Sequence, residues 1–205
     1  MSYISLGRVT SFMIHLNKLS TMVARFLPAA AGFSFSVLST VPVLAQGSLF
    51  TAIPVEESNF VLVAAPIGRS ARSQLNIYEQ RVNKRPCFSV SRSTPAMVSP
   101  LLSGFDFTGI CNRYTDSNGY SLRLGEDDMG TNYRFTVVKT GGDLELLAIP
   151  TLNPSKPIFT VARSGGIASG FVQLKLQPGW KLMRRAYGEK ALGHLYIYQD
   201  ITRTN

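Results

Sequence analysis

The sequence predicts an all-β fold: a compact antiparallel sandwich or barrel of about eight to ten short strands, preceded by a signal peptide. Only 16% of the 205 residues are charged, and 17 Gly and 11 Pro interrupt the chain at short intervals. Typical soluble domains contain about 25% charged residues. After residue 45 no segment of about ten or more residues shows helical periodicity, whereas several short segments alternate between apolar and polar residues.

The first expected strands follow a short arm. FVLVAAPI, residues 60–67, is a continuous apolar run closed by Pro66 and Gly68, which is typical of a strand buried on both faces. QLNIYEQ, residues 74–80, alternates, with Leu75 and Ile77 on one side. This pattern favours a strand, with a helical turn as the alternative.

The clearest unit is NYRFTVVKTGGDLELLAIP, residues 132–150. Tyr133, Phe135 and Val137 alternate with polar or exposed residues, and the alternation resumes after Gly141-Gly142. Two alternating runs joined by Gly-Gly predict a β-hairpin.

The remaining strands lie toward the C-terminus, in KPIFTVAR, residues 156–163, in GFVQLKLQPGWKLMRRAYG, residues 170–188, and in GHLYIYQD, residues 193–200. In the last of these, His194, Tyr196 and Tyr198 share one face, and Leu195 and Ile197 share the other. The sequence shows no internal repeat and no low-complexity tract.

The N-terminal part has the features of a secretory signal peptide. Arg25 is followed by apolar and small residues without another charge, up to Val43-Leu44-Ala45. Val43 and Ala45 supply small residues at the two outer positions of an A-x-A-like site, which favours cleavage between Ala45 and Gln46. The alternative is a retained membrane helix, because the uncharged run is long enough to span a bilayer, but its prolines and hydroxyl residues disfavour that.

These features predict three segments: a signal peptide over residues 1–45, an N-terminal arm over residues 46–58 and a single β-rich domain over residues 59–203. Translation from Met13 or Met22, in place of Met1, would give a more usual signal length. No membrane span is expected after cleavage.

The exported part is expected to be basic. Removing residues 1–45 takes away Arg8, Lys18 and Arg25, which leaves 18 basic against 12 acidic residues. A basic surface attracts anionic partners. For an exported protein we expect acidic envelope polysaccharide or another surface protein, and no nucleic acid.

Both cysteines, Cys87 and Cys111, lie in the exported part. An isolated pair in an oxidising compartment indicates a disulfide. Two buried free thiols are the alternative.

The segment FDFTGICNRYTDSNGYSLRLG, residues 105–125, is the most distinctive. Asn118-Gly119 favours a type I′ turn, and the Asp116 side chain can hydrogen-bond the backbone ahead of it. The turn leaves other polar side chains unexplained, so the segment supplies the candidate ligand-binding residues: Asn112, Arg113, Tyr114, Asp116 and Tyr120.

Catalytic candidates are few. Asp106 and Asp116 are the carboxylates we would nominate for glycoside hydrolysis, whereas Glu126-Asp127-Asp128 favours a solvated loop. His194 is the only histidine after residue 45, its strand setting indicates a structural role, and no G-x-S-x-G motif accompanies it. We expect no catalytic residue, no metal and no cofactor, because nucleotide-binding and calcium-loop motifs are also absent.

Two basic clusters in the sequence are candidate binding surfaces. Arg81, Lys84 and Arg85 precede Cys87, whereas Lys181, Arg184 and Arg185 follow Trp180. Tyrosines lie close to the second cluster in sequence, and aromatic rings with nearby cations bind sugars or anionic polymers. A solvated sheet face is the simpler alternative.

The motifs RPCFSV, FDFTGICNRYTDSNGYSLRLG, PGWKLMRRAYG and LGHLYIY resemble a family of secreted cyanobacterial proteins, the DUF3747-like domain of unknown function. The resemblance runs from about Phe60 to Tyr198 and implies an exported, envelope-associated protein with one compact domain. It implies no reaction, ligand or catalytic residue. We therefore expect a non-enzymatic module of the periplasm or cell surface that binds an envelope polymer or glycan or has a structural role there. The alternative is a secreted polysaccharide or cell-wall hydrolase using Asp106 and Asp116.

Overall fold

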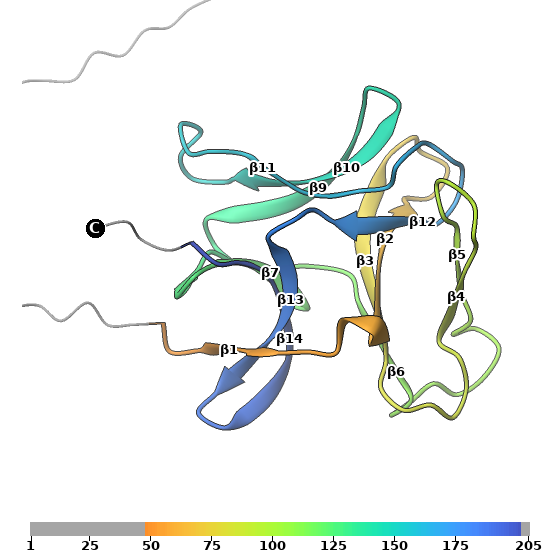
Figure 1. Ribbon diagram of the computed structural model, residues 1–205, viewed down its shortest axis with the longest axis horizontal. Coiled ribbons are helices and arrows are strands. Elements are labelled where there is room, and N and C mark those ends of the chain that lie inside the picture. Colours follow the sequence, from red (N-terminus) through yellow and green to blue (C-terminus); the bar gives the residue numbers. More distant parts are fainter. Residues whose placement is uncertain (1–47, 202–205) are drawn as a thin grey trace, which may run out of the picture. The chain divides into compact units, whose positions relative to one another are not determined.

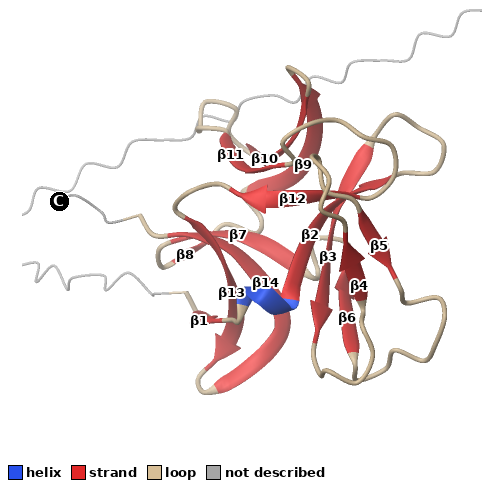
Figure 2. Ribbon diagram, turned by 45° about the vertical axis from the view of Figure 1, so that its right-hand side comes forward, coloured by secondary structure: helices blue, strands red, loops and turns tan. Residues whose placement is uncertain are grey.

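The structure is a computed structural model that describes residues 48–201. The described residues form fourteen strands and one three-residue 3-10 helix, which confirms the all-β class (Figure 2). The elements are β1 (Thr51–Pro54), η1 (Glu57–Asn59), β2 (Phe60–Pro66), β3 (Ser73–Gln80), β4 (Phe88–Val90), β5 (Val98–Pro100), β6 (Cys111–Tyr114), β7 (Tyr120–Leu124), β8 (Asp127–Asp128), β9 (Tyr133–Thr140), β10 (Asp143–Pro150), β11 (Phe159–Arg163), β12 (Val172–Leu176), β13 (Trp180–Tyr187) and β14 (Lys190–Gln199). Strands of two to four residues are too short for an alternating pattern to reveal, which is why fewer strands were expected.

Six strands close into an antiparallel barrel. The order is β2-β12-β11-β10-β9-β3, and β3 pairs back with β2 along its whole length. The barrel closes between β3 and β9 through a single residue pair, Ser73 with Val137. β3 pairs instead with β6 from Ile77 onward, and a cavity lies along the seam between β3 and β9.

The β9–β10 hairpin is confirmed, with continuous register from Asp143↔Thr140 to Pro150↔Tyr133. Gly141 and Gly142 join its strands with φ of 58° and 85°. Both values lie in the left-handed region that glycine adopts without steric cost. The apolar alternation points into the barrel, where Tyr133, Leu146 and Ala148 belong to the core.

β2 is buried on both faces, as its apolar run predicts. Leu62 and Ala64 face the barrel core. Val61 and Val63 face outward into a second cluster with Tyr78 and Val98. The β4–β5 ribbon covers this outer face, and Figure 1 shows it on the side of β2 and β3 opposite to β13 and β14.

A five-stranded sheet, ordered β1-β13-β14-β7-β8, packs against the barrel. Leu122, Leu182 and Ile197 on its inner face share the barrel's hydrophobic core. The arm expected over residues 46–58 supplies β1, which pairs with β13 at the edge of the sheet. The β14–β7 pairing is parallel, which departs from the all-antiparallel expectation. These strands are not neighbours in sequence, so no hairpin fixes their direction.

Asn118-Gly119 forms a turn, but not the predicted type I′ turn. Gly119 is not among the described glycines with positive φ. Its amide instead donates to the carbonyl of Asp116 at 2.9 Å. A Cβ on Gly119 would lie 3.0 Å from the Cβ of Tyr114, so glycine is needed here for close approach. The turn carries the chain from β6 in the barrel sheet to β7 in the five-stranded sheet.

The predicted signal peptide and the Ala45–Gln46 cleavage site lie outside the described residues. Within residues 48–201, no helix has the length and apolar character needed to cross a membrane.

Candidate functional site

Strand alternation divides the candidate residues on β6. Asn112 and Tyr114 point toward Glu79 of the neighbouring strand β3. Arg113 faces the other way and is exposed. The five candidate residues therefore do not form one site.

Asn112 and Tyr114 belong to a buried polar cluster centred on Glu79. The Tyr114 hydroxyl donates to Glu79 Oε2 at 2.6 Å, and Asn112 Nδ2 donates to the same oxygen at 2.8 Å. Arg184 Nη2, from β13, lies 2.6 Å from Glu79 Oε1. Burial and the hydrogen bond to Glu79 raise the pKa of Tyr114. This cluster joins the barrel to the five-stranded sheet. Its polar groups already form hydrogen bonds and an ion pair with one another.

Tyr120 and Asp116 also have structural roles. Tyr120 is buried in the core and its hydroxyl donates to the Leu75 carbonyl at 2.9 Å. Burial raises the pKa of Tyr120. Asp116 Oδ1 accepts from the Asn118 amide at 2.9 Å, as predicted for a side chain that hydrogen-bonds the backbone ahead of it.

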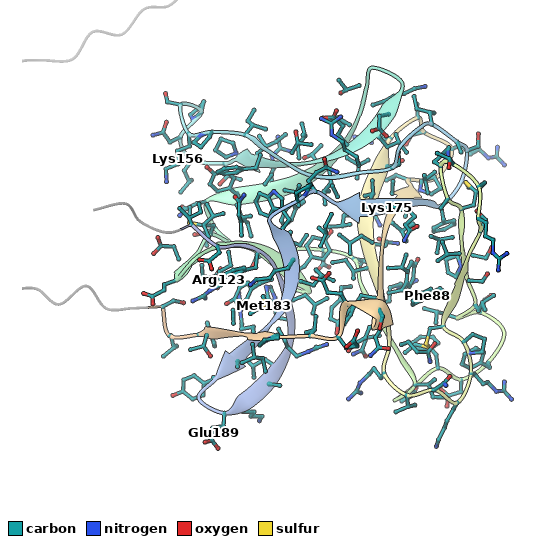
Figure 3. The ribbon with its side chains drawn as sticks, in the orientation of Figure 1. Phe88, Arg123, Lys156, Lys175, Met183 and Glu189 are labelled. Atoms are coloured by element: carbon teal, nitrogen blue, oxygen red, sulfur yellow. A yellow bond between two sulfur atoms is a disulfide. The ribbon has the colours of Figure 1, made fainter. Side chains whose placement is uncertain are left out.

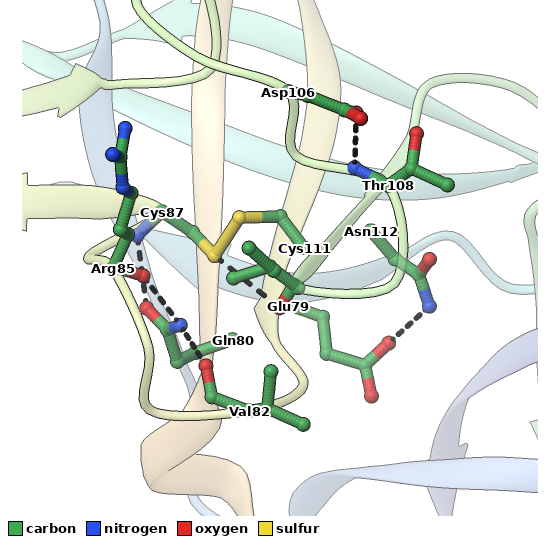
Figure 4. The surroundings of a disulfide bond; sticks show 10 residues. Glu79, Gln80, Val82, Arg85, Cys87, Asp106, Thr108, Cys111 and Asn112 are labelled. Atoms are coloured by element: carbon green, nitrogen blue, oxygen red, sulfur yellow. Dashed lines mark hydrogen bonds between the residues drawn. A yellow bond between two sulfur atoms is a disulfide. The ribbon is translucent and has the colours of Figure 1, made fainter.

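Asp106, the other carboxylate nominated for hydrolysis, makes the same kind of contact. Its Oδ1 accepts from the Thr108 amide at 2.9 Å, and this hydrogen bond lowers the pKa of Asp106 (Figure 4). Asp106 and Asp116 are therefore each engaged by the backbone of their own loops.

The predicted disulfide joins Cys87 to Cys111, with Cα atoms 5.8 Å apart (Figure 4). Beside it, the Gln80 side chain organises the loop that precedes Cys87. Gln80 Oε1 accepts from the Cys87 amide at 2.8 Å, and its Nε2 donates to the carbonyls of Val82 and Arg85. The loop over residues 81–86 is thus held at both ends.

Four exposed cations lie in the segments next to the disulfide-bonded cysteines, and we call them the basic end: Arg81, Lys84, Arg85 and Arg113. They come from adjoining segments, because the Arg81 amide donates to the Ile110 carbonyl at 2.8 Å. Within residues 48–201 none of the four makes an ion pair; Arg85 instead lies over the Phe105 ring at 5.1 Å. The adjoining loop over residues 101–110 contributes a single carboxylate, Asp106.

The second basic cluster expected from the sequence is divided between two faces. Arg184 points inward to Glu79. Arg185 lies on the outer face of the five-stranded sheet, where its Nη2 is 2.8 Å from Asp128 Oδ2. Successive residues of a strand point to opposite faces of the sheet, which places these consecutive arginines on different partners.

Tyr196 lies at the centre of the outer face. The guanidinium carbons of Arg123 and Arg185 lie 5.0 Å and 4.9 Å from its ring centroid. Its hydroxyl donates to Asp128 Oδ2 at 2.7 Å. Lys181 lies 4.9 Å from the ring of Tyr198 on the same face.

His194 completes the outer-face network. Its Nδ1 lies 2.8 Å from the Asn118 carbonyl and its Nε2 lies 2.8 Å from Ser121 Oγ. A carbonyl only accepts, so Nδ1 donates and Nε2 accepts from the serine hydroxyl. Burial lowers the pKa of His194. The sequence indicated a structural histidine and identified no serine partner.

Two cavities adjoin this network. One, of about 810 Å³, is lined by residues that include Phe50, Arg123, Met183 and Tyr198, and Figure 3 shows Arg123 and Met183 near β1 and β13. The other, of about 520 Å³, occupies the seam between β3 and β9 and reaches Ser121. The described part of the chain contains no group of three or more His, Cys, Asp or Glu side chains arranged to hold a metal ion.

Comparison with curated proteins and with solved structures finds no significant match. The family model described as "Protein of unknown function (DUF3747)" matches residues 27–202. This match covers most of the chain and includes the whole of the described fold. The chain therefore belongs to the DUF3747 family of proteins of unknown function.

Proposed function

We propose that the protein is an exported, envelope-associated module that binds an acidic polysaccharide through its basic end. The observation that carries this proposal is that Arg81, Lys84, Arg85 and Arg113, in the segments next to the disulfide, are exposed and have no ion-pair partner among residues 48–201. Their charges remain available to a ligand, unlike those of Arg163, Arg184 and Arg185.

The scaffold beneath these cations favours binding. The disulfide and the Gln80 side chain both restrain the loop over residues 81–86, and Arg113 projects from a strand. Restrained binding groups lose less conformational entropy when a ligand engages them. An extended anionic polymer could contact several of these cations at once.

Export is supported by the predicted leader, by the disulfide and by the resemblance to secreted proteins. Disulfides persist in oxidising compartments. An acidic envelope polymer is therefore the anionic partner that such a protein would meet.

The alternative, a polysaccharide hydrolase using Asp106 and Asp116, has less support. A catalytic carboxylate pair must present its oxygens to the scissile bond. Here each carboxylate accepts a backbone hydrogen bond within its own loop.

The test measures binding of protein purified after expression of the full chain to alginate, a uronic-acid polymer, with neutral dextran as the uncharged comparison. Replacing all four cations of the basic end by Gln should weaken alginate binding by about tenfold or more, since several modest ion pairs add up to this effect. Binding to dextran should be absent throughout.

A matched variant controls for net charge. It replaces four exposed cations outside the basic end by Gln: Arg69, Lys139, Lys156 and Lys190. We expect this variant to retain most of its alginate affinity. Equal losses in the two variants would show that net charge, not the basic end, governs the binding.

A further inference from the structure

A serine hydroxyl and an imidazole meet on the outer face of the five-stranded sheet. Ser121 lies on β7 and His194 on β14, and the parallel pairing of these strands brings together residues 73 positions apart. Ser121 Oγ lies 2.8 Å from His194 Nε2. This is the distance needed for a base to remove a proton from a nucleophile.

The imidazole is fixed in the orientation that such a base requires. The Asn118 carbonyl accepts from His194 Nδ1 at 2.8 Å, which leaves the Nε2 lone pair directed at the serine. In hydrolases that use a serine and a histidine, a third group holds the imidazole in this tautomer. Burial, which lowers the pKa of His194, favours the neutral imidazole that can accept a proton.

The cavity at the barrel seam reaches Ser121. It has a volume of about 520 Å³ and is lined by residues of β3, β9 and the β6–β7 turn, with Ser121 and Gly130 among them. A Cβ on Gly130 would lie 3.2 Å from Ser121 Cβ and 3.5 Å from its Oγ. A side chain at residue 130 would therefore crowd the serine, and glycine leaves this space beside the hydroxyl free.

A guanidinium lies beside the serine hydroxyl. Arg185 Nη2 is 3.5 Å from Ser121 Oγ and is held in place by Asp128 Oδ2 at 2.8 Å. A positioned cation beside a developing oxyanion stabilises the transition state of acyl transfer.

We propose that Ser121 and His194 form a nucleophile–base pair that hydrolyses esters of small acyl groups entering through the seam cavity. A small acyl group is required because Ser121 is only 6% exposed. This activity goes beyond polysaccharide binding at the basic end, and it involves different residues.

In the first step, Ser121 Oγ bonds to the ester carbonyl carbon while its proton passes to His194 Nε2. The carbonyl electron pair moves to the carbonyl oxygen. Collapse of this intermediate breaks the bond to the alcohol oxygen, which takes the proton from Nε2. Water then attacks the acyl-serine by the same route and releases the carboxylic acid, so the enzyme is regenerated without any oxidant or reductant.

The test treats the full-chain protein with a small fluorophosphonate and identifies the modified residue by peptide mass spectrometry. We expect an adduct on Ser121, and hydrolysis of p-nitrophenyl acetate that the reagent abolishes. An intact protein that carries no adduct on Ser121 would overturn the proposal, and this measurement requires no variant.

Variants then separate catalysis from structural support. His194→Gln should slow both labelling and hydrolysis by about 100-fold or more, because the general base is lost. Gly130→Ala should slow both by obstructing the approach to Oγ. Ser155→Ala, on an exposed loop, is the control and should change neither rate. Ser121 labelling that is equally fast in a folded His194→Gln protein would show that the pair has only a structural role.

Discussion

The buried polar residues of this protein are paired with partners far away in the sequence. Glu79 meets Arg184 across 105 positions, and Ser121 meets His194 across 73. No local sequence pattern predicts such pairs. Glu79 lies in an alternating strand and Ser121 follows a turn, and neither setting indicates a partner so far away in the chain. The sequence identified Asn112 and Tyr114 as polar residues that the turn did not need, but it could not show that Glu79 and Arg184 satisfy them.

His194 gives a prediction at this scale. The folded pKa of His194 is lowered, mainly by burial and in part by Arg185, against the raising effects of the Asn118 carbonyl and Asp128. The unfolded chain, with a pKa near about 6.5, therefore binds a proton that the folded chain resists. Stability should be fully present above about pH 6.5 and should fall as the pH decreases toward the folded pKa.

Thermal unfolding of the protein at pH 7 and pH 5 measures this effect. Between these pH values the melting temperature of the wild-type protein should fall by more than that of His194→Gln. The carboxylates are the same in both proteins, so their contribution to the change is common to both. Parallel losses in the two proteins would mean that His194 does not contribute to the pH dependence.

At the scale of elements, local sequence patterns predicted the long strands well. The β9–β10 hairpin follows from its alternation and Gly141-Gly142, and the double burial of β2 follows from its apolar run. The parallel pairing of β7 with β14 and the short ribbon β4–β5 were not predictable, because they depend on contacts between distant segments. The Asn118-Gly119 turn was recognised, but its glycine serves close packing against Tyr114.

The disulfide gives the prediction for this scale. It joins the first residue of β6 to the residue before β4, and its cysteines are 24 positions apart. In the chain-entropy model, a cross-link closing a loop of this size stabilises a protein by about 3 to 4 kcal/mol. Cys87→Ser, Cys111→Ser and reduction of the wild-type protein should each lower the free energy of unfolding by this amount.

Urea unfolding with and without reductant measures these losses. The double variant, with both cysteines replaced by Ser, should be insensitive to reductant. Unequal losses in the two single variants, or a wild-type protein unaffected by reductant, would contradict a stabilising cross-link.

At the scale of the whole molecule, the barrel and the five-stranded sheet share one hydrophobic core, so residues 48–201 form a continuous packed unit. The cations on this unit are of two kinds. Arg184 and Arg185 are neutralised by internal carboxylates, whereas the four cations of the basic end face solvent. The basic character evident in the sequence thus becomes a local surface next to the disulfide, a placement that the charge count alone could not predict.

The most direct test of the binding account is a titration of the isotopically labelled protein with an alginate oligosaccharide, followed by backbone amide chemical shifts. The account predicts that the largest shifts lie in residues 81–87 and 105–113 and diminish as salt screens the charges. Shifts confined to the outer face of β13 and β14, or no shifts at low salt, would contradict it.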